Sequence, residues 1–168
     1  EILIIAASGD ARVIAADMLA QAEHDVEASA ILLTTSKRLA RAVAKQVEAQ
    51  LAVLPTAPVA RKAIAKNSAV ILVRSLDEAV ELANRFAPEH LSIADESLLP
   101  GITSAGGVFV GPHSPEAAGD YASGPNHVLP TSGAARTRAG LSALDFVKII
   151  SVQQLDAAAL ARLAPAIT

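Results

Sequence analysis

The feature that most constrains the fold is a regular alternation between short apolar runs and longer segments with helical periodicity. The runs are rich in Ile, Val and Leu, and in the segments between them apolar residues recur every three or four positions. Strands that alternate with helices form a parallel sheet with helices on its faces. The predicted strands are residues 1–7, 28–34, 69–73, 91–93 and 107–111, and the predicted helices are 11–24, 36–54, 59–66, 75–86 and 156 onward. We therefore predict an α/β, Rossmann-like fold with three α/β/α layers and a mainly parallel, incomplete sheet.

Local signals refine this prediction. The runs 1–7 and 69–73 are apolar almost throughout, which is typical of strands buried on both faces. Ser75 and Glu78 have the spacing of a capping box at the start of a helix, and Pro88 follows the end of that helix.

The composition excludes several classes of protein. Hydrophobic residues make up 52% of the 168 residues, enough to build a folded core. A net charge of −3 and an aromatic content of 2% argue against nucleic-acid binding. The absence of cysteine excludes disulfides, thiolate metal sites and a cysteine nucleophile. The apolar runs are too short to span a bilayer and no signal peptide is visible, so we expect a cytoplasmic protein without a membrane partner.

Glycine is scarce where a nucleotide-binding loop would need it. The sequence has no glycine between Gly9 and Gly101, whereas a dinucleotide fingerprint needs several in the first strand-to-helix turn. If a nucleotide cofactor is used, we expect another part of the protein to hold most of it. The chain also starts without methionine in a strand pattern and ends in a helical pattern, so we expect it to be a segment of a longer protein.

Residues 114–131 form the most informative stretch. Three prolines and two glycines in eighteen residues exclude a long helix or a central strand. The polar residues on this stiff segment are Glu116, Asp120, Tyr121, Asn126 and His127. Asp120 could ligate a divalent metal, and His127 could do so or bind substrate. Alternatively, Asp120 is a turn residue and His127 a packed loop histidine.

Two further pairs are close in sequence. Gln21 and His24 lie three residues apart near the end of a predicted helix, so they share a face and could offer an oxygen and a nitrogen to a metal. They could equally form a polar helix end that suits the helix dipole. Glu89 and His90 suit proton transfer, although a Glu–His pair at a helix exit can also be a plain surface feature.

These motifs together resemble histidinol dehydrogenase along nearly the whole chain. The matching pieces are EILIIA at 1–6, DMLAQAEHD at 17–25, NRFAPEHL at 84–91, AGGVFVGPHSPEAAGDYASGPNHVLPTSG at 105–133 and LDFVKIISVQQL at 144–155. The long motif at 105–133 is highly specific, and the order and spacing of the other pieces agree with it. The resemblance implies an enzyme that oxidises L-histidinol to L-histidine through an aldehyde-level intermediate, with zinc and two NAD molecules used in succession.

The resemblance assigns roles position by position. Gln21, His24 and Asp120 match three zinc ligands that also lie against the substrate, and the fourth ligand of the family is a histidine outside this sequence. Glu89 and His90 match the acid–base pair. By this resemblance His90 takes the proton of the substrate hydroxyl, and Glu89 activates water for attack on the aldehyde-level intermediate.

The resemblance also covers the substrate and the partner subunit. His127 matches a residue that contacts substrate, and Tyr121 is expected to line the same pocket. The domain that binds most of the NAD lies outside this sequence, and full-length members form homodimers. We assign 1–140 to a Rossmann-like catalytic core and 141–168 to the start of a C-terminal helical tail. Ala7 stands where an aspartate is common and His113 where an aromatic residue is usual.

Two other functions stay open. A member of the same family could oxidise another polar alcohol with the same zinc site. The chain could also be a non-catalytic scaffold domain of this ancestry. We predict that these 168 residues alone are inactive, because a metal ligand and the cofactor domain are absent from the sequence.

Overall fold

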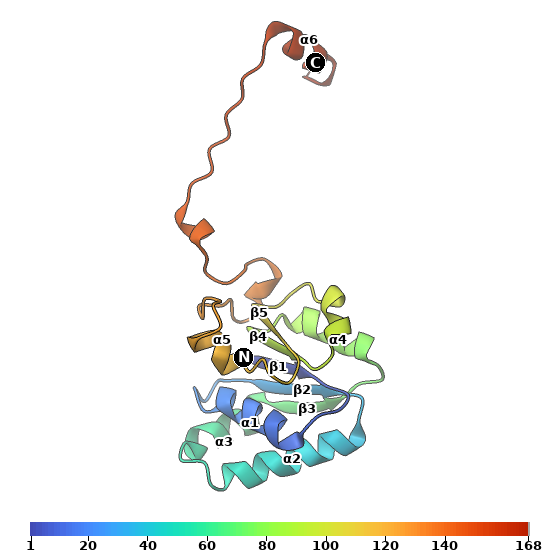
Figure 1. The fold of residues 1–168 in the computed structure, drawn as a ribbon, viewed down its shortest axis with the longest axis vertical. Coiled ribbons are helices and arrows are strands. Elements are labelled where there is room, and N and C mark those ends of the chain that lie inside the picture. The colour runs from blue at the N-terminus through green and yellow to red at the C-terminus, as the bar shows by residue number, and fades with distance from the viewer. Residues whose placement is uncertain (168) are drawn as a thin grey trace.

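A computed structural model, which describes residues 1–167, shows a five-stranded sheet with helices on both faces (Figure 1). The strands are β1 (Ile2–Ile5), β2 (Ala30–Thr34), β3 (Ala69–Leu72), β4 (His90–Ile93) and β5 (Gly107–Val110). They lie in the order β3-β2-β1-β4-β5, and every neighbouring pair is parallel. The α/β prediction is confirmed, and the sheet is parallel throughout rather than mainly so.

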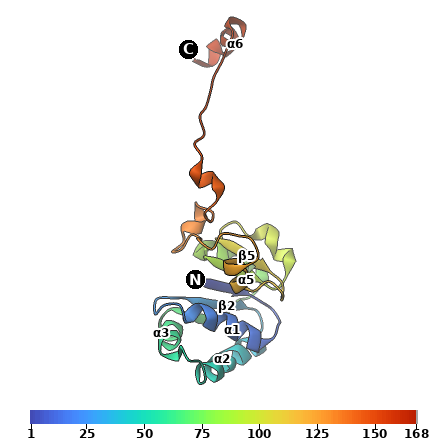
Figure 2. The same ribbon diagram turned by 60° about the vertical axis from the view of Figure 1, so that its left-hand side comes forward.

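The core consists of two apolar clusters, one on each face of the sheet, between the strands and the helices. The main helices are α1 (Ala11–Ala22), α2 (Lys37–Leu51), α3 (Ala57–Asn67) and α4 (Leu76–Phe86). Ile2 and Ile4 of β1 belong to the cluster shared with α1, α2 and α3, whereas Leu3 and Ile5 belong to the cluster shared with α4. Side chains that alternate along β1 thus contact three helices on one face and α4 on the other. Figures 1 and 2 show α1, α2 and α3 together on one side of the sheet, and Figure 1 shows α4 on the other side.

Side-chain caps fix the starts of α2 and α4. The Ser36 hydroxyl accepts from the backbone N–H of Leu39 at 3.2 Å, and the Ser75 hydroxyl accepts from that of Glu78 at 3.1 Å. The expected capping box at Ser75 is only half formed. The Glu78 carboxylate accepts instead from the backbone N–H of Arg74 at 2.6 Å, one residue earlier.

One burial prediction is wrong. The run 69–73 was expected to be a buried strand, but β3 is an edge strand in which Ile71 is 39% and Leu72 48% exposed. An apolar run indicates a hydrophobic strand. Whether that strand is flanked by one strand or by two depends on the strand order of the sheet. Because β3 pairs only with β2, one of its edges has no neighbour among the described residues.

The register sets the place of the polar residues. Ile2 of β1 lies opposite His90 of β4, and His90 lies opposite Gly107 of β5. His90 is therefore the first residue of its strand and sits at the amino edge of the parallel sheet.

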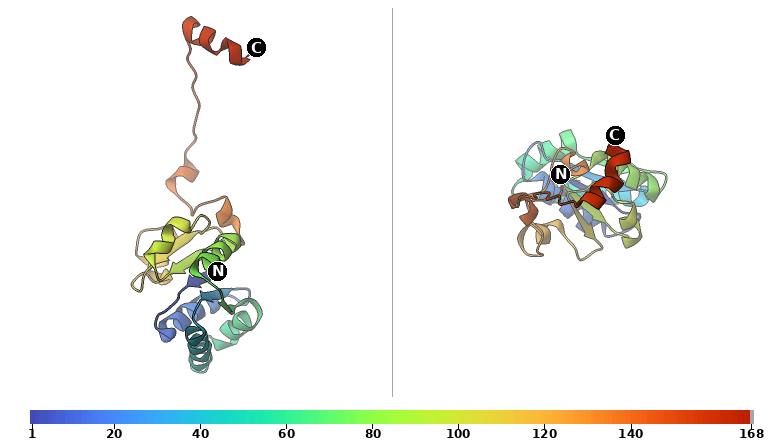
Figure 3. Two further views of the ribbon diagram at one scale, coloured as in Figure 1. Left: turned by 90° about the vertical axis from the view of Figure 1, so that its right-hand side faces the viewer. Right: turned by 90° about the horizontal axis from the view of Figure 1, so that it is seen from above.

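The last part of the chain runs away from the sheet (Figures 1 and 3). The remaining helices are η1 (Glu96–Gly101), α5 (Glu116–Tyr121), η2 (Ala134–Arg136), η3 (Ala143–Phe146) and α6 (Ala157–Ile167). Phe146 at the end of η3 is 79% exposed, and Ile149 and Val152 between η3 and α6 are 87% and 85% exposed. The proposed division at residues 140 and 141 remains a prediction, and Thr168 lies outside the described residues. Within 1–167, no helix has the length and apolarity needed to cross a bilayer.

Candidate active site

A cavity of about 760 Å³ opens at the amino edge of the sheet, between α1 and α5. It is lined by all seven residues proposed from the sequence: Gln21, His24, Glu89, His90, Asp120, Tyr121 and His127. They come from three separate parts of the chain, so the fold brings together side chains up to 106 residues apart (127 minus 21). His113, which is exposed, does not line it.

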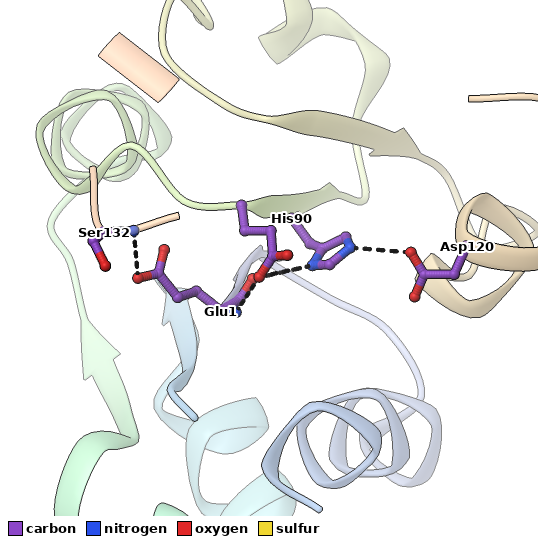
Figure 4. Close-up of polar contacts among 5 residues, drawn as sticks. Glu1, His90, Asp120 and Ser132 are labelled. Carbon is purple, nitrogen blue, oxygen red and sulfur yellow. Dashed lines mark hydrogen bonds and ion pairs between the residues drawn. The ribbon is translucent and has the colours of Figure 1, made fainter. Parts of the chain in front are cut away.

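His90 is the most enclosed of these residues, with its side chain only 8% exposed. Its ring lies between Glu1 and Asp120 (Figure 4). Nδ1 is 3.3 Å from the carbonyl oxygen of Glu1, so the tautomer that carries hydrogen on Nδ1 satisfies this contact. Nε2 lies 3.5 Å from Oδ1 of Asp120 and forms no hydrogen bond with the described residues. In this tautomer the lone pair of Nε2 is the proton acceptor of the ring.

Glu89 stands beside this ring. Its Oε2 lies 3.8 Å from Nδ1 of His90 and 2.7 Å from the backbone nitrogen of Glu1. The Glu89 side chain is 19% exposed, so it is reachable from the cavity but partly shielded from water. A carboxylate in this position can accept a proton from a water molecule.

The backbone before His90 is held by two glycines. The N–H of Gly106 donates to the carbonyl of Pro88, and the N–H of Gly107 donates to the carbonyl of Glu89, both at 2.9 Å. A Cβ atom on Gly106 would lie 2.6 Å from the carbonyl oxygen of Glu89. Only glycine therefore permits this close approach of residue 106, just before β5, to the Glu89 peptide.

Residues 114–131 are not wholly a loop. They contain the short helix α5, which carries both Glu116 and Asp120 toward the cavity. One hydrogen bond ties the start of the segment to β5, and another closes a turn near its end. The Ser114 hydroxyl donates to the carbonyl of Val110 at 2.8 Å, and the Asn126 side chain accepts from the N–H of Val128 at 2.9 Å. A long helix is excluded, as predicted.

Sequence reasoning gave no role to two carboxyl groups that line the cavity, although it named Glu116 among the polar residues of 114–131. Asp17 lines the cavity four residues before Gln21, and Glu116 lines it four residues before Asp120. Each acid is thus one helical turn from a proposed metal ligand, and that spacing was a signal available in the sequence. Burial raises the pKa of the Asp17 carboxyl above its ordinary value.

Glu116 is the most perturbed group in the cavity. Burial raises the pKa of its carboxyl to about 7, and the charges of Asp17 and Asp120 act in the same direction. Its own backbone N–H and the Ser92 hydroxyl oppose the change. Its Oε1 is buried without a hydrogen-bond partner among residues 1–167. The folded state therefore favours the protonated form of Glu116.

This shift predicts a pH-dependent effect of Glu116→Gln. Because the folded-state pKa is raised, the contribution of Glu116 to stability is complete below pH 4.5 and is lost as the pH rises through about 7. Relative to wild type, E116Q should gain roughly 3 kcal/mol in free energy of unfolding between pH 4 and pH 8. Urea unfolding of both proteins at the two pH values measures this difference.

The exposed residue Glu81 supplies the control for that experiment. The free energy of unfolding of E81Q should differ from that of wild type by nearly the same amount at both pH values. If the difference in free energy of unfolding between E116Q and wild type is also the same at both pH values, Glu116 is not a buried, destabilising charge at high pH.

The donor set predicted from the sequence is Gln21, His24 and Asp120, and all three line the same cavity. They offer an amide oxygen, an imidazole nitrogen and a carboxylate oxygen, the donor types found at divalent metal sites. Residues 1–167 contain no group of three His, Cys, Asp or Glu side chains placed to hold a metal ion. The proposed set has only two members of those types, since its third donor is an amide. The donor chemistry fits zinc.

Comparison with known proteins decides the family. The family model described as histidinol dehydrogenase matches residues 1–168. The chain belongs to the histidinol dehydrogenase family. It is 51% identical over 152 residues to histidinol dehydrogenase of Bacillus cereus (strain ATCC 14579), covering 88% of this chain and 35% of the relative. It is 52% identical over 170 residues to that of Nitrobacter winogradskyi, covering 99% of this chain and 40% of the relative.

A solved family member has the same fold. A crystal structure of histidinol dehydrogenase from Elizabethkingia anophelis matches with a TM-score of 0.90 and 40% sequence identity, over 99% of this chain and 39% of that chain. The family predicted from the sequence motifs is confirmed. The chain spans between 35% and 40% of the length of these three relatives.

Proposed function

We propose that the protein containing this chain is a cytoplasmic, zinc- and NAD-dependent histidinol dehydrogenase that carries out the four-electron oxidation of L-histidinol to L-histidine in histidine biosynthesis. The observation that carries this proposal is the gathering of all seven candidate residues around one cavity. Membership of the histidinol dehydrogenase family supports the choice of reaction.

His90 is proposed as the base of the first oxidation. The carbonyl of Glu1 lies against Nδ1, so Nε2 remains to take the proton of the substrate hydroxyl. The hydride leaves from the carbon that bears this hydroxyl. Glu89 is proposed to take a proton from the water that attacks the aldehyde-level intermediate, which prepares the second hydride transfer. His127 and Tyr121, both exposed on the rim of the cavity, would contact the substrate.

Gln21, His24 and Asp120 are proposed to hold the zinc ion and to lie against the substrate. A bound zinc ion would fix the nitrogen atoms of the substrate and so orient its alcohol carbon. The described residues include no glycine-rich turn that suits NAD, because the first strand-to-helix turn contains only Gly9. We therefore assign no residue of this chain to NAD.

A homodimer of the complete protein is also proposed. The segment after η2 exposes large apolar side chains, including Leu144, Phe146 and Ile149 at 76%, 79% and 87%. Exposed apolar surface of this kind is typical of a segment that packs on another surface.

The proposal is tested by assaying NADH release from the complete gene product with L-histidinol, beside the 168-residue chain. We expect turnover and zinc binding for the complete protein, and no turnover for the chain alone. Gln21→Ala and Asp120→Ala should each weaken zinc binding by at least about 10-fold, as measured by competition with a chelator.

The same assay separates the other functions. A complete protein that oxidises another polar alcohol but not histidinol would shift the assignment within the family. A protein that binds zinc but oxidises neither would support a scaffold. Robust turnover by the isolated chain would overturn its predicted inactivity.

A further inference from the structure

A single aromatic ring connects the proposed base with the helix that carries Asp120. Phe109 of β5 lies beside His90 of β4, with ring centroids 5.8 Å apart and planes inclined by 40°. The role assigned to His90 by family resemblance does not involve this ring. Within residues 1–167, it is the only ring that forms a ring–ring contact with a proposed active-site residue.

The register explains why the ring reaches His90. His90 lies opposite Gly107, and Ser92 lies opposite Phe109 two residues later, so all four are on the same face of the sheet. Gly107 has no side chain to fill the place beside His90. A Cβ atom on Gly107 would lie 3.4 Å from Cε2 of Phe109, so the ring leans over this glycine into the vacant place.

The other side of the ring supports α5. Gly119 is buried, and a Cβ atom there would lie 2.5 Å from Cε1 and 2.8 Å from Cζ of Phe109. The backbone of α5 therefore rests directly on the ring edge. Asp120, the next residue, lies 3.5 Å from Nε2 of His90. The distance between α5 and the His90 ring is thus spanned by Phe109.

We propose that Phe109, seated between Gly107 and Gly119, is a positioning residue that sets the orientation of the His90 ring relative to α5. This inference rests on the proposed role of His90 as the base. A base must hold its proton-accepting nitrogen in line with the substrate hydroxyl, and an imidazole fixed only through Nδ1 can still tilt about that contact. A ring packed against it limits the tilt.

The test measures kcat and KM of the complete enzyme with Phe109→Leu, Phe109→Tyr and Gly119→Ala. F109L removes the flat ring but keeps most of its volume, and should lower kcat by about 10- to 100-fold while KM for histidinol changes by less than about 3-fold. F109Y keeps the ring but adds a hydroxyl at Cζ, an atom that packs on Gly119, and should lower kcat in the same direction as G119A. G119A places a methyl group against the ring edge and should lower kcat in the same way as F109L.

Val108→Ala is the matched control. Val108 belongs to the same strand but packs into the apolar cluster on the α4 face of the sheet. V108A should lower stability, measured by urea unfolding, without the selective loss of kcat. If F109L and V108A have the same kcat at equal stability, Phe109 is a packing residue only and the inference is wrong.

A double-mutant cycle with His90→Asn adds a readout that a packing role would not produce. If Phe109 acts through His90, F109L should change kcat by less than about 2-fold in the H90N background. Multiplicative losses would contradict the inference. A wild-type enzyme that does not oxidise histidinol would overturn the proposed function and this inference with it, whereas an active wild type with unaffected Phe109 variants would overturn this inference alone.

Discussion

Replacing His90 with asparagine should lower kcat of the complete enzyme by about 10²- to 10⁴-fold, the usual range for loss of a general base. The choice of asparagine isolates the proton transfer. Its side-chain NH₂ can still donate to the carbonyl of Glu1, which lies 3.3 Å from Nδ1 in the wild type. The variant should therefore keep its fold and lose only the acceptor at the position of Nε2. Steady-state NADH release measures kcat, and circular dichroism checks the fold.

His113→Asn is the control for this experiment, because His113 is exposed and lies outside the cavity. It should leave kcat within about 2-fold of wild type, as a surface substitution does. An H90N enzyme that keeps wild-type kcat would remove His90 from the mechanism.

Glu89→Gln should lower kcat as well, with accumulation of the aldehyde-level product, because the proposed role of Glu89 is in the second oxidation.

Gly106→Ala should have the largest effect on folding, a loss of about 3 kcal/mol in free energy of unfolding. The new methyl group would lie 2.6 Å from the carbonyl oxygen of Glu89, and that backbone atom cannot move aside without shifting the Glu89–His90 segment. The substitution should also break the 2.9 Å hydrogen bond from the Gly106 N–H to Pro88. Urea unfolding of the chain measures the stability.

Gly101→Ala supplies a matched change of glycine to alanine. Its new methyl group would meet only Cγ1 of Val80, at 3.1 Å, and a side-chain end can give way. We expect a loss below about 1 kcal/mol for this control. Equal losses for the two variants would show that the Gly106 contact with Glu89 does not constrain the site.

The extent of the sequence prediction can be judged from particular elements. The alternation of apolar runs with helical periods predicted α1, α2 and α4 to within a few residues at each end, because an amphipathic face is a local property. The parallel sheet followed from the same alternation. Strand order did not, so the burial of β3 was predicted wrongly: the same apolar run suits a central strand or an edge.

The candidate site shows the same division. The sequence motifs identified the candidate residues and the family. The motif at 105–133 and the two pairs that begin at Gln21 and Glu89 can be recognised from the sequence without a structure. They did not show that the cavity would open at the amino edge of a parallel sheet. The usual ligand site of such folds is at the opposite, carboxyl edge.

The sequence by itself determined the class of fold, the family and the identities of the candidate site residues. These depend on patterns within short stretches of sequence, and such local patterns do not depend on which distant residues come into contact. Only the tertiary structure showed that Nδ1 of His90 lies against the carbonyl of Glu1 and that burial raises the pKa of Glu116. It alone placed Phe109 against His90. Those properties arise from neighbours distant in sequence, such as Glu1 beside His90 and Asp17 near Glu116, and the burial that sets them exists only once the sheet has formed.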